Sequence, residues 1–206
     1  FPTRRSSDLA SWVLSQGLSA ERPLVILSDN GIDHALFALS AQHVGVPSAA
    51  ISPAYSLMSR DFDKLKSTIE LLDPGAIYVA STKPFAAALA AIKPLHRAVI
   101  VSGNPEDADA LAFPAIAATP ESPDVAKAFA AVTPDTIAKF LFTSGSTGTP
   151  KLSLLTAANL IASAEATAQV AGTDAYWRDQ SRSELKIAAP TIEPRYTSAY
   201  SCDTDP

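Results

Sequence analysis

From Leu24 onward, short runs of β-favouring apolar residues alternate along the chain with segments of helical periodicity, and Gly, Pro or Asp residues separate them. Parallel strands need a crossover connection, usually a helix, so a chain that alternates in this way builds a parallel sheet with helices on its faces. We therefore predict the α/β class, with a largely parallel sheet and flanking helices.

The pattern also places the individual elements. Ile32, Leu36 and Leu39, followed by His43, recur at helical spacing and are predicted to share the face of one helix. Ser59 and Thr156 are predicted N-caps. The proline- and alanine-rich residues 103–135 are predicted to form a long surface connection with one or two short helical turns. Predicted strands cover 24–27, 48–51, 76–80, 98–101, 137–142 and 151–155, and predicted helices cover 32–44, 59–72, 84–92 and 156–170.

Composition narrows the class of protein. With 206 residues, 47% hydrophobic and 18% charged, the chain suits a globular domain with a sizeable core. A net charge of −5 disfavours binding to nucleic acid or to an anionic membrane surface. No apolar run approaches the ~18 residues of a spanning helix, and the lone Cys202 cannot form an intramolecular disulfide. We expect a cytoplasmic protein with no membrane span and no nucleic-acid partner.

The chemically most informative segment runs from Thr143 to Lys151 and reads TSGSTGTPK. Its glycines let backbone N–H groups converge on an anion, its hydroxyls add donors, and its lysine adds a positive charge. We predict an ATP-binding and phosphate-binding loop made of Thr143, Ser144, Gly145, Ser146, Thr147, Gly148, Thr149 and Lys151.

Two other phosphate-binding motifs do not fit this segment. In a Walker A loop that starts at Gly145, Pro150 would replace the second glycine and Leu152 the final hydroxyl residue. The eight glycines of the chain contain no G-x-G-x-x-G triple, which excludes the dinucleotide fingerprint. A plain Ser/Thr/Gly surface turn is the remaining structural alternative.

The loop resembles the T-S-G-S-T-G-x-P-K signature of the adenylate-forming superfamily, which includes acyl-CoA synthetases, luciferases and peptide-synthetase adenylation domains. Within it, the chain looks most like feruloyl-CoA synthases and related aromatic acid:CoA ligases, over residues 28–36, 44–47, 51–61 and 134–142. The resemblance covers residues 18–170. It implies that residues 10–170 form part of the AMP-binding N-terminal domain of the adenylate-forming fold.

The resemblance implies an acid–thiol ligase that joins a carboxylate, here an aromatic or hydroxycinnamic acid, to ATP and then transfers the acyl group to coenzyme A. ATP, Mg²⁺ and coenzyme A are the implied cofactors and co-substrates.

The family motifs for adenine and magnesium, for ribose and for the catalytic lysine are missing, and Ala157 stands where the family usually has His. We therefore expect an inactive N-terminal fragment with no catalytic residue and no metal ligand. A degenerate non-catalytic fragment and a piece of a peptide-synthetase adenylation domain remain alternatives.

Both ends of the chain differ from the rest. Residues 1–9, FPTRRSSDL, resemble the translation of a widely used sequencing adapter, and we expect them to be an artefact. Residues 171–206 form an irregular tail without a sustained period, for which frameshifted read-through and an unusual native linker are both open. His34, His43 and His96 are far apart and lack metal-ligand spacing, so we expect them to have surface or packing roles.

Overall fold

The computed structural model describes residues 4–106, 109–143 and 151–170. The chain divides into two compact units, 1–163 and 164–206, and the strands all belong to the first. They form a seven-stranded sheet in the order β5-β4-β3-β1-β2-β6-β7. The strands are β1 (Leu24–Ile26), β2 (Ser48–Ala50), β3 (Ala76–Ser81), β4 (Val99–Asn104), β5 (Ala110–Ala112), β6 (Ile137–Thr143) and β7 (Lys151–Thr156).

Every neighbouring pair from β5 across to β6 is parallel, and only the β6–β7 pair is antiparallel. The α/β class with a largely parallel sheet is therefore confirmed. The helices are α1 (Arg4–Ser15), α2 (Ile32–His43), α3 (Ala54–Leu57), α4 (Asp63–Leu72), α5 (Thr82–Ile92), the 3-10 helix η1 (Lys93–Leu95), α6 (Phe113–Ile116), α7 (Asp124–Ala130) and α8 (Ala157–Val170). In the described part of the chain, none of them is long and apolar enough to cross a membrane.

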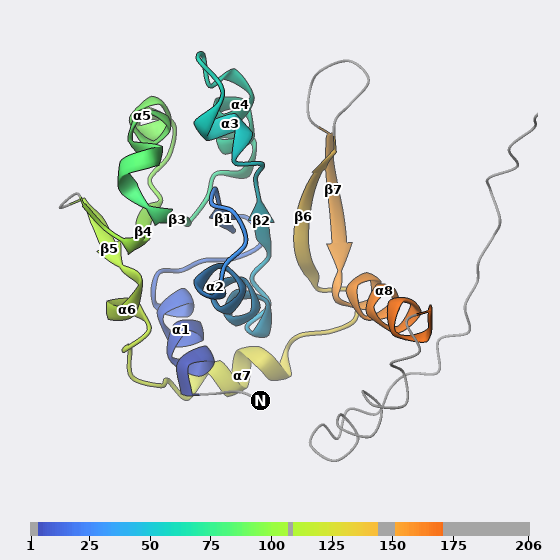
Figure 1. Ribbon diagram of the computed structural model, residues 1–206. Coiled ribbons are helices and arrows are strands. Elements are labelled where there is room, and N and C mark those ends of the chain that lie inside the picture. Colours follow the sequence, from blue (N-terminus) through green and yellow to red (C-terminus); the bar gives the residue numbers. More distant parts are fainter. Residues whose placement is uncertain (1–3, 107–108, 144–150, 171–206) are drawn as a thin grey trace, which may run out of the picture. The chain divides into compact units, whose positions relative to one another are not determined.

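Helices cover both faces of the sheet, as Figure 1 shows. On one face, α1, α2, α6 and α7 pack in a core around Phe37, Tyr78 and Phe113. On the other face, α4 and α5 pack in a second core around Leu65, Ile69 and Phe85. Burial on both faces explains why the strands are apolar at consecutive positions and not at alternate ones.

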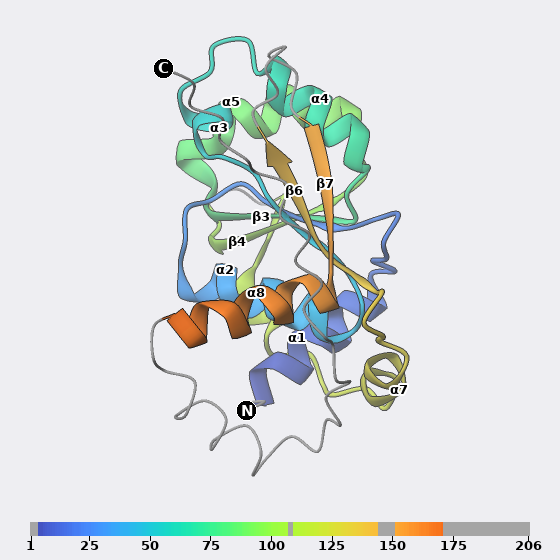
Figure 2. The same ribbon diagram turned by 90° about the vertical axis from the view of Figure 1, so that its right-hand side faces the viewer.

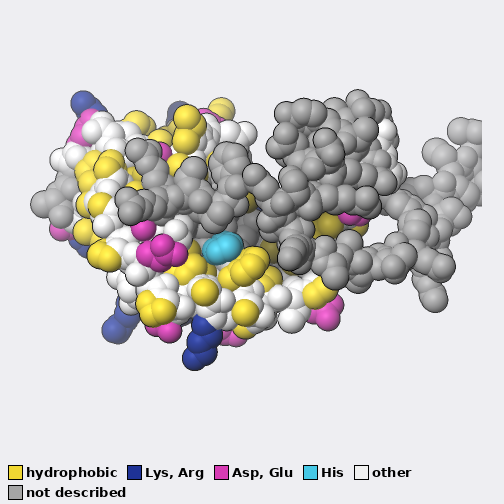
Figure 3. Space-filling view, turned by 90° about the horizontal axis from the view of Figure 1, so that it is seen from below, with side chains coloured by type: hydrophobic (Ala, Val, Ile, Leu, Met, Phe, Trp, Pro, Cys, Tyr) yellow, Lys and Arg dark blue, Asp and Glu magenta, His cyan; other side chains and the backbone are white. Residues whose placement is uncertain are grey.

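The apolar stripe that predicted helix α2 faces the core only in part, because Leu36 packs against the first core but the other two residues do not. Ile32 is 79% exposed and Leu39 is 61% exposed, whereas Phe37, Ser40 and Ala41 are buried. Figure 3 looks onto this helical side of the molecule and shows apolar side chains at the surface among polar ones. The helix was predicted correctly, and its most deeply buried side chains come from a neighbouring face, where the small Ser40 and Ala41 allow close packing against the sheet.

Residues 103–135 are more structured than predicted. They contain a fifth parallel strand, β5, as well as α6 and α7, and they contribute the buried side chains of Phe113, Ile116 and Val125 to the first core. Two of the prolines lie at helix starts, Pro114 in the first turn of α6 and Pro123 at the N-cap of α7, where a missing N–H costs no hydrogen bond.

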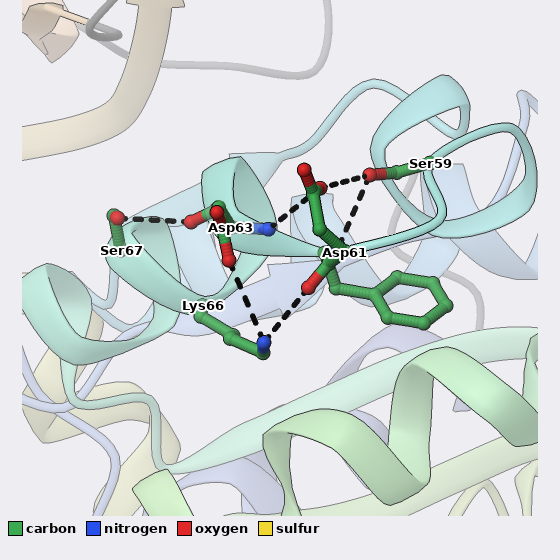
Figure 4. A network of polar contacts seen from close by, with 6 residues as sticks. Ser59, Asp61, Asp63, Lys66 and Ser67 are labelled. Carbon is green, nitrogen blue, oxygen red and sulfur yellow. Dashed lines mark hydrogen bonds and ion pairs between the residues drawn. The ribbon is translucent and has the colours of Figure 1, made fainter.

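Helix α4 begins later than predicted, at Asp63, and the separate short helix α3 precedes it. Ser59 Oγ accepts the Phe62 N–H at 3.1 Å, and Asp61 Oδ1 accepts the Asp63 N–H at 3.2 Å (Figure 4). Ser59 is therefore part of a turn before the helix and is not its N-cap. Lys66 Nζ closes the same turn by donating to Asp61 O at 2.7 Å.

Helix α1 lies in a segment that the sequence analysis set aside in part. It begins at Arg4, and Leu9 is fully buried with Trp12 and Val13 in the first core. Residues 4–9 therefore take part in the fold of this chain. Their origin from an adapter stays a prediction, as do the boundaries at residues 10 and 170.

Candidate functional site

The predicted loop follows the carboxyl end of β6, which lies between β2 and the edge strand β7. Because β1 to β6 are all parallel, their carboxyl ends lie at one edge of the sheet, and β6 reaches this edge at Thr143. The chain leaves β1 toward α2 on one face and leaves the adjacent β2 toward α3 and α4 on the other. Open α/β sheets bind ligands at such an edge, where neighbouring connections diverge.

A β-hairpin fixes the two ends of the loop. Thr143 pairs with Lys151, and the antiparallel register continues to the pair of Ile137 and Thr156. Thr143 Oγ1 also donates to Lys151 O at 3.4 Å, and Figure 2 shows the two strands side by side. The structure thus brings together the first and the last predicted site residues. The other six lie outside the described residues: Ser144, Gly145, Ser146, Thr147, Gly148 and Thr149.

The two faces of the hairpin differ in character. Phe140, Phe142 and Leu152 pack against the second core, which anchors one face. Side chains alternate along a strand and directly opposed residues share a face, so Thr143 and Lys151 lie on the opposite face. The lysine is exposed, and among the described residues it forms no ion pair. Its positive charge is therefore available to a ligand at the start of β7.

The helix that follows the hairpin has the predicted cap. The Asn159 N–H donates to Thr156 Oγ1 at 3.4 Å, and the Thr156 N–H donates to Asn159 Oδ1 at 3.1 Å. This reciprocal pair satisfies backbone donors at the start of α8. The Ala157 N–H donates to Thr136 O at 2.9 Å, which ties the helix start to the segment before β6.

A polar group that the sequence analysis missed lies at the same edge of the sheet. A side chain on Gly103 would place its Cβ 3.3 Å from both Asp33 Oδ2 and Tyr78 Oη, so this glycine leaves room for the two oxygens. Burial, with the charge of Asp33 second, raises the pKa of Tyr78 to about 12. The phenol therefore stays a hydrogen-bond donor at neutral pH. No sequence motif joins these residues, because they come from α2, β3 and β4.

The three histidines lie in separate places. His34 Nδ1 bonds to Asp29 O at 3.2 Å, and His43 stacks on Phe129 with ring centroids 4.5 Å apart. His96 follows η1 near the start of β4. Burial lowers the pKa of both His43 and His96. Within residues 4–106, 109–143 and 151–170, no group of three or more His, Cys, Asp or Glu side chains is placed to hold a metal ion.

Comparison with protein families gives one match. The model of the family described as "AMP-binding enzyme" matches residues 3–189. A comparison with curated proteins found no match.

Solved structures share the fold of this chain. A putative long-chain-fatty-acid CoA ligase from Rhodopseudomonas palustris is 18% identical with a TM-score of 0.65, over 81% of this chain and 39% of that one. A benzoate CoA ligase from Burkholderia xenovorans LB400 is 18% identical with a TM-score of 0.61, over 79% and 29%. ATP-bound MatB from Rhodopseudomonas palustris is 18% identical with a TM-score of 0.55, over 81% and 31%. The chain thus spans between 29% and 39% of the length of these proteins.

Proposed function

Because the chain belongs to the AMP-binding enzyme family, we propose that it is part of an ATP-dependent carboxylate:CoA ligase, which forms an acyl-adenylate and then an acyl-CoA thioester. The observation that carries the proposal is the Thr143–Lys151 pair, which holds at one end of the TSGSTGTPK segment an exposed lysine that forms no ion pair with the described residues. A solved neighbour with the same fold contains ATP.

The chemistry required of these residues is positioning and charge stabilisation. A carboxylate oxygen attacks the α-phosphorus of ATP, and pyrophosphate leaves with the bonding electron pair. The Lys151 ammonium and the Thr143 hydroxyl are proposed to hold the β- and γ-phosphates, so that charge on the departing pyrophosphate is stabilised. The loop residues 144–149 are proposed to add backbone and hydroxyl donors. Among the described residues no group of three or more His, Cys, Asp or Glu side chains is placed to hold a metal ion, and the proposal assigns no step to a metal.

An aromatic acid is the proposed substrate class. Its support is the similarity of residues 51–61 and 134–142 to hydroxycinnamate-activating ligases, together with a benzoate CoA ligase among the fold neighbours. At 18% identity that neighbour supports the fold, and the substrate class rests mainly on the sequence similarity. Coenzyme A is the proposed acyl acceptor, and a cytoplasmic location is proposed with it.

The second candidate is a domain that binds nucleotide without catalysing ligation. Its support is Ala157, which stands where the family usually has His. Long-read sequencing on both sides of the gene separates the candidates. A continuous frame with the missing adenine, ribose and lysine motifs supports the ligase, whereas a stop codon directly after Pro206 leaves the non-catalytic domain.

Binding of pyrophosphate and ATP tests the site itself. Lys151→Ala should weaken binding of either ligand to the purified chain by roughly ten- to a hundredfold, because a charge-assisted hydrogen bond contributes about 1.5–3 kcal/mol. Isothermal titration calorimetry provides the measurement. Lys127→Ala, which removes an exposed lysine on α7, is the matched control. Equal weakening by both substitutions, or none by Lys151→Ala, would remove Lys151 from the site.

A further inference from the structure

His96 is held in one tautomer by a backbone hydrogen bond. The Ala98 N–H donates to His96 Nδ1 at 3.0 Å, so the neutral ring carries its hydrogen on Nε2. Nε2 is itself buried and has no hydrogen-bond partner among the described residues. The ring is therefore anchored through a single acceptor atom.

This arrangement determines where a proton can bind. The neutral imidazole has one free lone pair, on Nδ1, and the Ala98 N–H already occupies it. Uptake of a proton turns Nδ1 into a donor that faces another donor, so the hydrogen bond to Ala98 must break. The charged ring would also have to remain in a half-buried position with its Nε2 atom shielded from solvent, which is unfavourable.

The bond lies at a junction of the fold. His96 directly follows η1, and η1 contacts both α4 and α5. Strand β4 begins three residues later, at Val99. The Val99 N–H donates to Gly75 O at 3.1 Å, which places the start of β4 beside the end of the α4–β3 connection. The segment 93–98 therefore joins α5 to the amino end of β4.

The surrounding charges provide little compensation for a protonated ring. Burial lowers the pKa of His96, and the carboxylate of Asp73 at the end of α4 opposes this effect more weakly. Lys93 of η1 is engaged with Asp109 at 3.0 Å. The remaining charged residues on the neighbouring elements and on the segment itself are Asp63, Lys64, Lys66 and Glu70 in α4, Lys83 in the first turn of α5 and the exposed Arg97.

We propose that His96 is an acid-sensitive latch, in which proton uptake breaks the bond to the Ala98 amide and releases the connection formed by residues 93–98. Opening of this segment is coupled to one proton. Its equilibrium constant should therefore rise by up to about tenfold per pH unit as the pH falls below the ordinary histidine range.

Amide hydrogen exchange of the purified 206-residue chain tests the latch. Exchange is measured between pH 7.5 and 5.5, corrected for the intrinsic pH dependence of amide exchange, and referenced to β3. Residues 93–98 should open more at low pH than β3 does. His96→Asn keeps an acceptor oxygen near the Nδ1 position but cannot titrate, so it should abolish this extra opening. His34→Asn is the matched control and should preserve it.

Two results would overturn the latch. One is equal pH dependence of the 93–98 exchange in wild type and His96→Asn. The other, which needs no variant, is a nitrogen NMR spectrum of the wild-type chain in which His96 carries its neutral-form hydrogen on Nδ1. Asp73→Asn provides a further check, because loss of the carboxylate removes the charge that favours a protonated ring in the closed segment, so the extra opening at pH 5.5 should be at least as large as in wild type. A smaller extra opening would contradict the proposed charge balance.

Discussion

At the scale of single residues, burial and hydrogen bonding separate serines that look alike in the sequence. Ser28 and Ser56 are both about 95% buried. Ser28 Oγ accepts the Ala80 N–H and so links the carboxyl ends of β1 and β3, whereas Ser56 Oγ has no partner among the described residues. The same hydroxyl group therefore stabilises the fold at one position and costs free energy at the other.

Replacing these two serines tests that difference. Ser28→Ala should lower the free energy of unfolding by about 1–3 kcal/mol, since it leaves the Ala80 N–H without its acceptor. Ser56→Ala removes an unsatisfied buried hydroxyl and should leave stability unchanged or raise it by about 1 kcal/mol. Urea unfolding of both variants provides the measurement. A large loss in Ser56→Ala would mean that its hydroxyl has a partner.

Backbone conformation gives a second residue-scale prediction. Asp73 has a φ of +41°, in the left-handed region that costs a non-glycine residue about 1–2 kcal/mol. Asp73→Gly should therefore raise the free energy of unfolding by roughly 0.5–1 kcal/mol, after the entropy of glycine in the unfolded chain is deducted. Asp63→Gly, the same exchange within α4, should lower it by about 1 kcal/mol. If both variants lose stability, the conformation of Asp73 carries no strain.

At the scale of elements, α2 shows how an apolar stripe can mislead. The spacing of Ile32, Leu36 and Leu39 correctly indicates a helix, but the residues that pack on the sheet are Phe37, Ser40 and Ala41. Phe37 forms edge-to-face ring contacts with Trp12, Tyr78 and Phe113 at centroid distances of 5.7, 6.1 and 5.8 Å. The inward face of α2 is therefore set by the large side chain of Phe37 together with the small side chains of Ser40 and Ala41.

Substitutions on the two faces of α2 check this orientation. Phe37→Ala should destabilise the chain by about 3–5 kcal/mol, because it leaves a cavity among aromatic rings. Leu39→Glu should change stability by no more than about 0.5 kcal/mol, since the side chain is 61% exposed and both residues are good helix formers. Thermal unfolding followed by circular dichroism compares the two. A strong effect of Leu39→Glu would mean that this face is covered in solution.

At the scale of the whole molecule, half-buried histidines make the fold sensitive to acid. Burial lowers the pKa of His43 and of His96 below the ordinary value of 6.5. The unfolded chain therefore binds these protons more readily than the folded chain does. Stability is fully retained above the ordinary pKa and decreases as the pH falls from 6.5 toward the lower folded values.

The urea midpoint should accordingly decrease between pH 7.5 and pH 5.5. His43→Gln should flatten this dependence, because it removes one of the two groups. A second decrease is expected below about pH 4.5, where Glu21 and Asp61 become protonated, since hydrogen bonds from Ser19 and Ser59 lower the pKa values of these carboxyl groups. A midpoint that is constant from pH 7.5 to 5.5 would contradict the burial of His43 and His96.

The sequence by itself determined the class of fold and the two strands that flank residues 144–150. Alternating strand and helix signals are local, and a parallel sheet is the arrangement that satisfies them, so β1 to β4, β6 and β7 were predicted to within a few residues. The pairing of Thr143 with Lys151 likewise follows from two β-rich runs separated by a short glycine-rich loop.

Only the tertiary structure decided which faces are buried and which distant residues meet. The core positions of Leu9, Phe113 and Val125 depend on contacts between elements far apart in sequence, where composition had indicated an artefact or a surface loop. The meeting of Asp33, Tyr78 and Gly103 and the capture of His96 Nδ1 by the Ala98 amide are likewise products of packing. Local periodicity reports secondary structure, whereas burial is a property of the assembled chain.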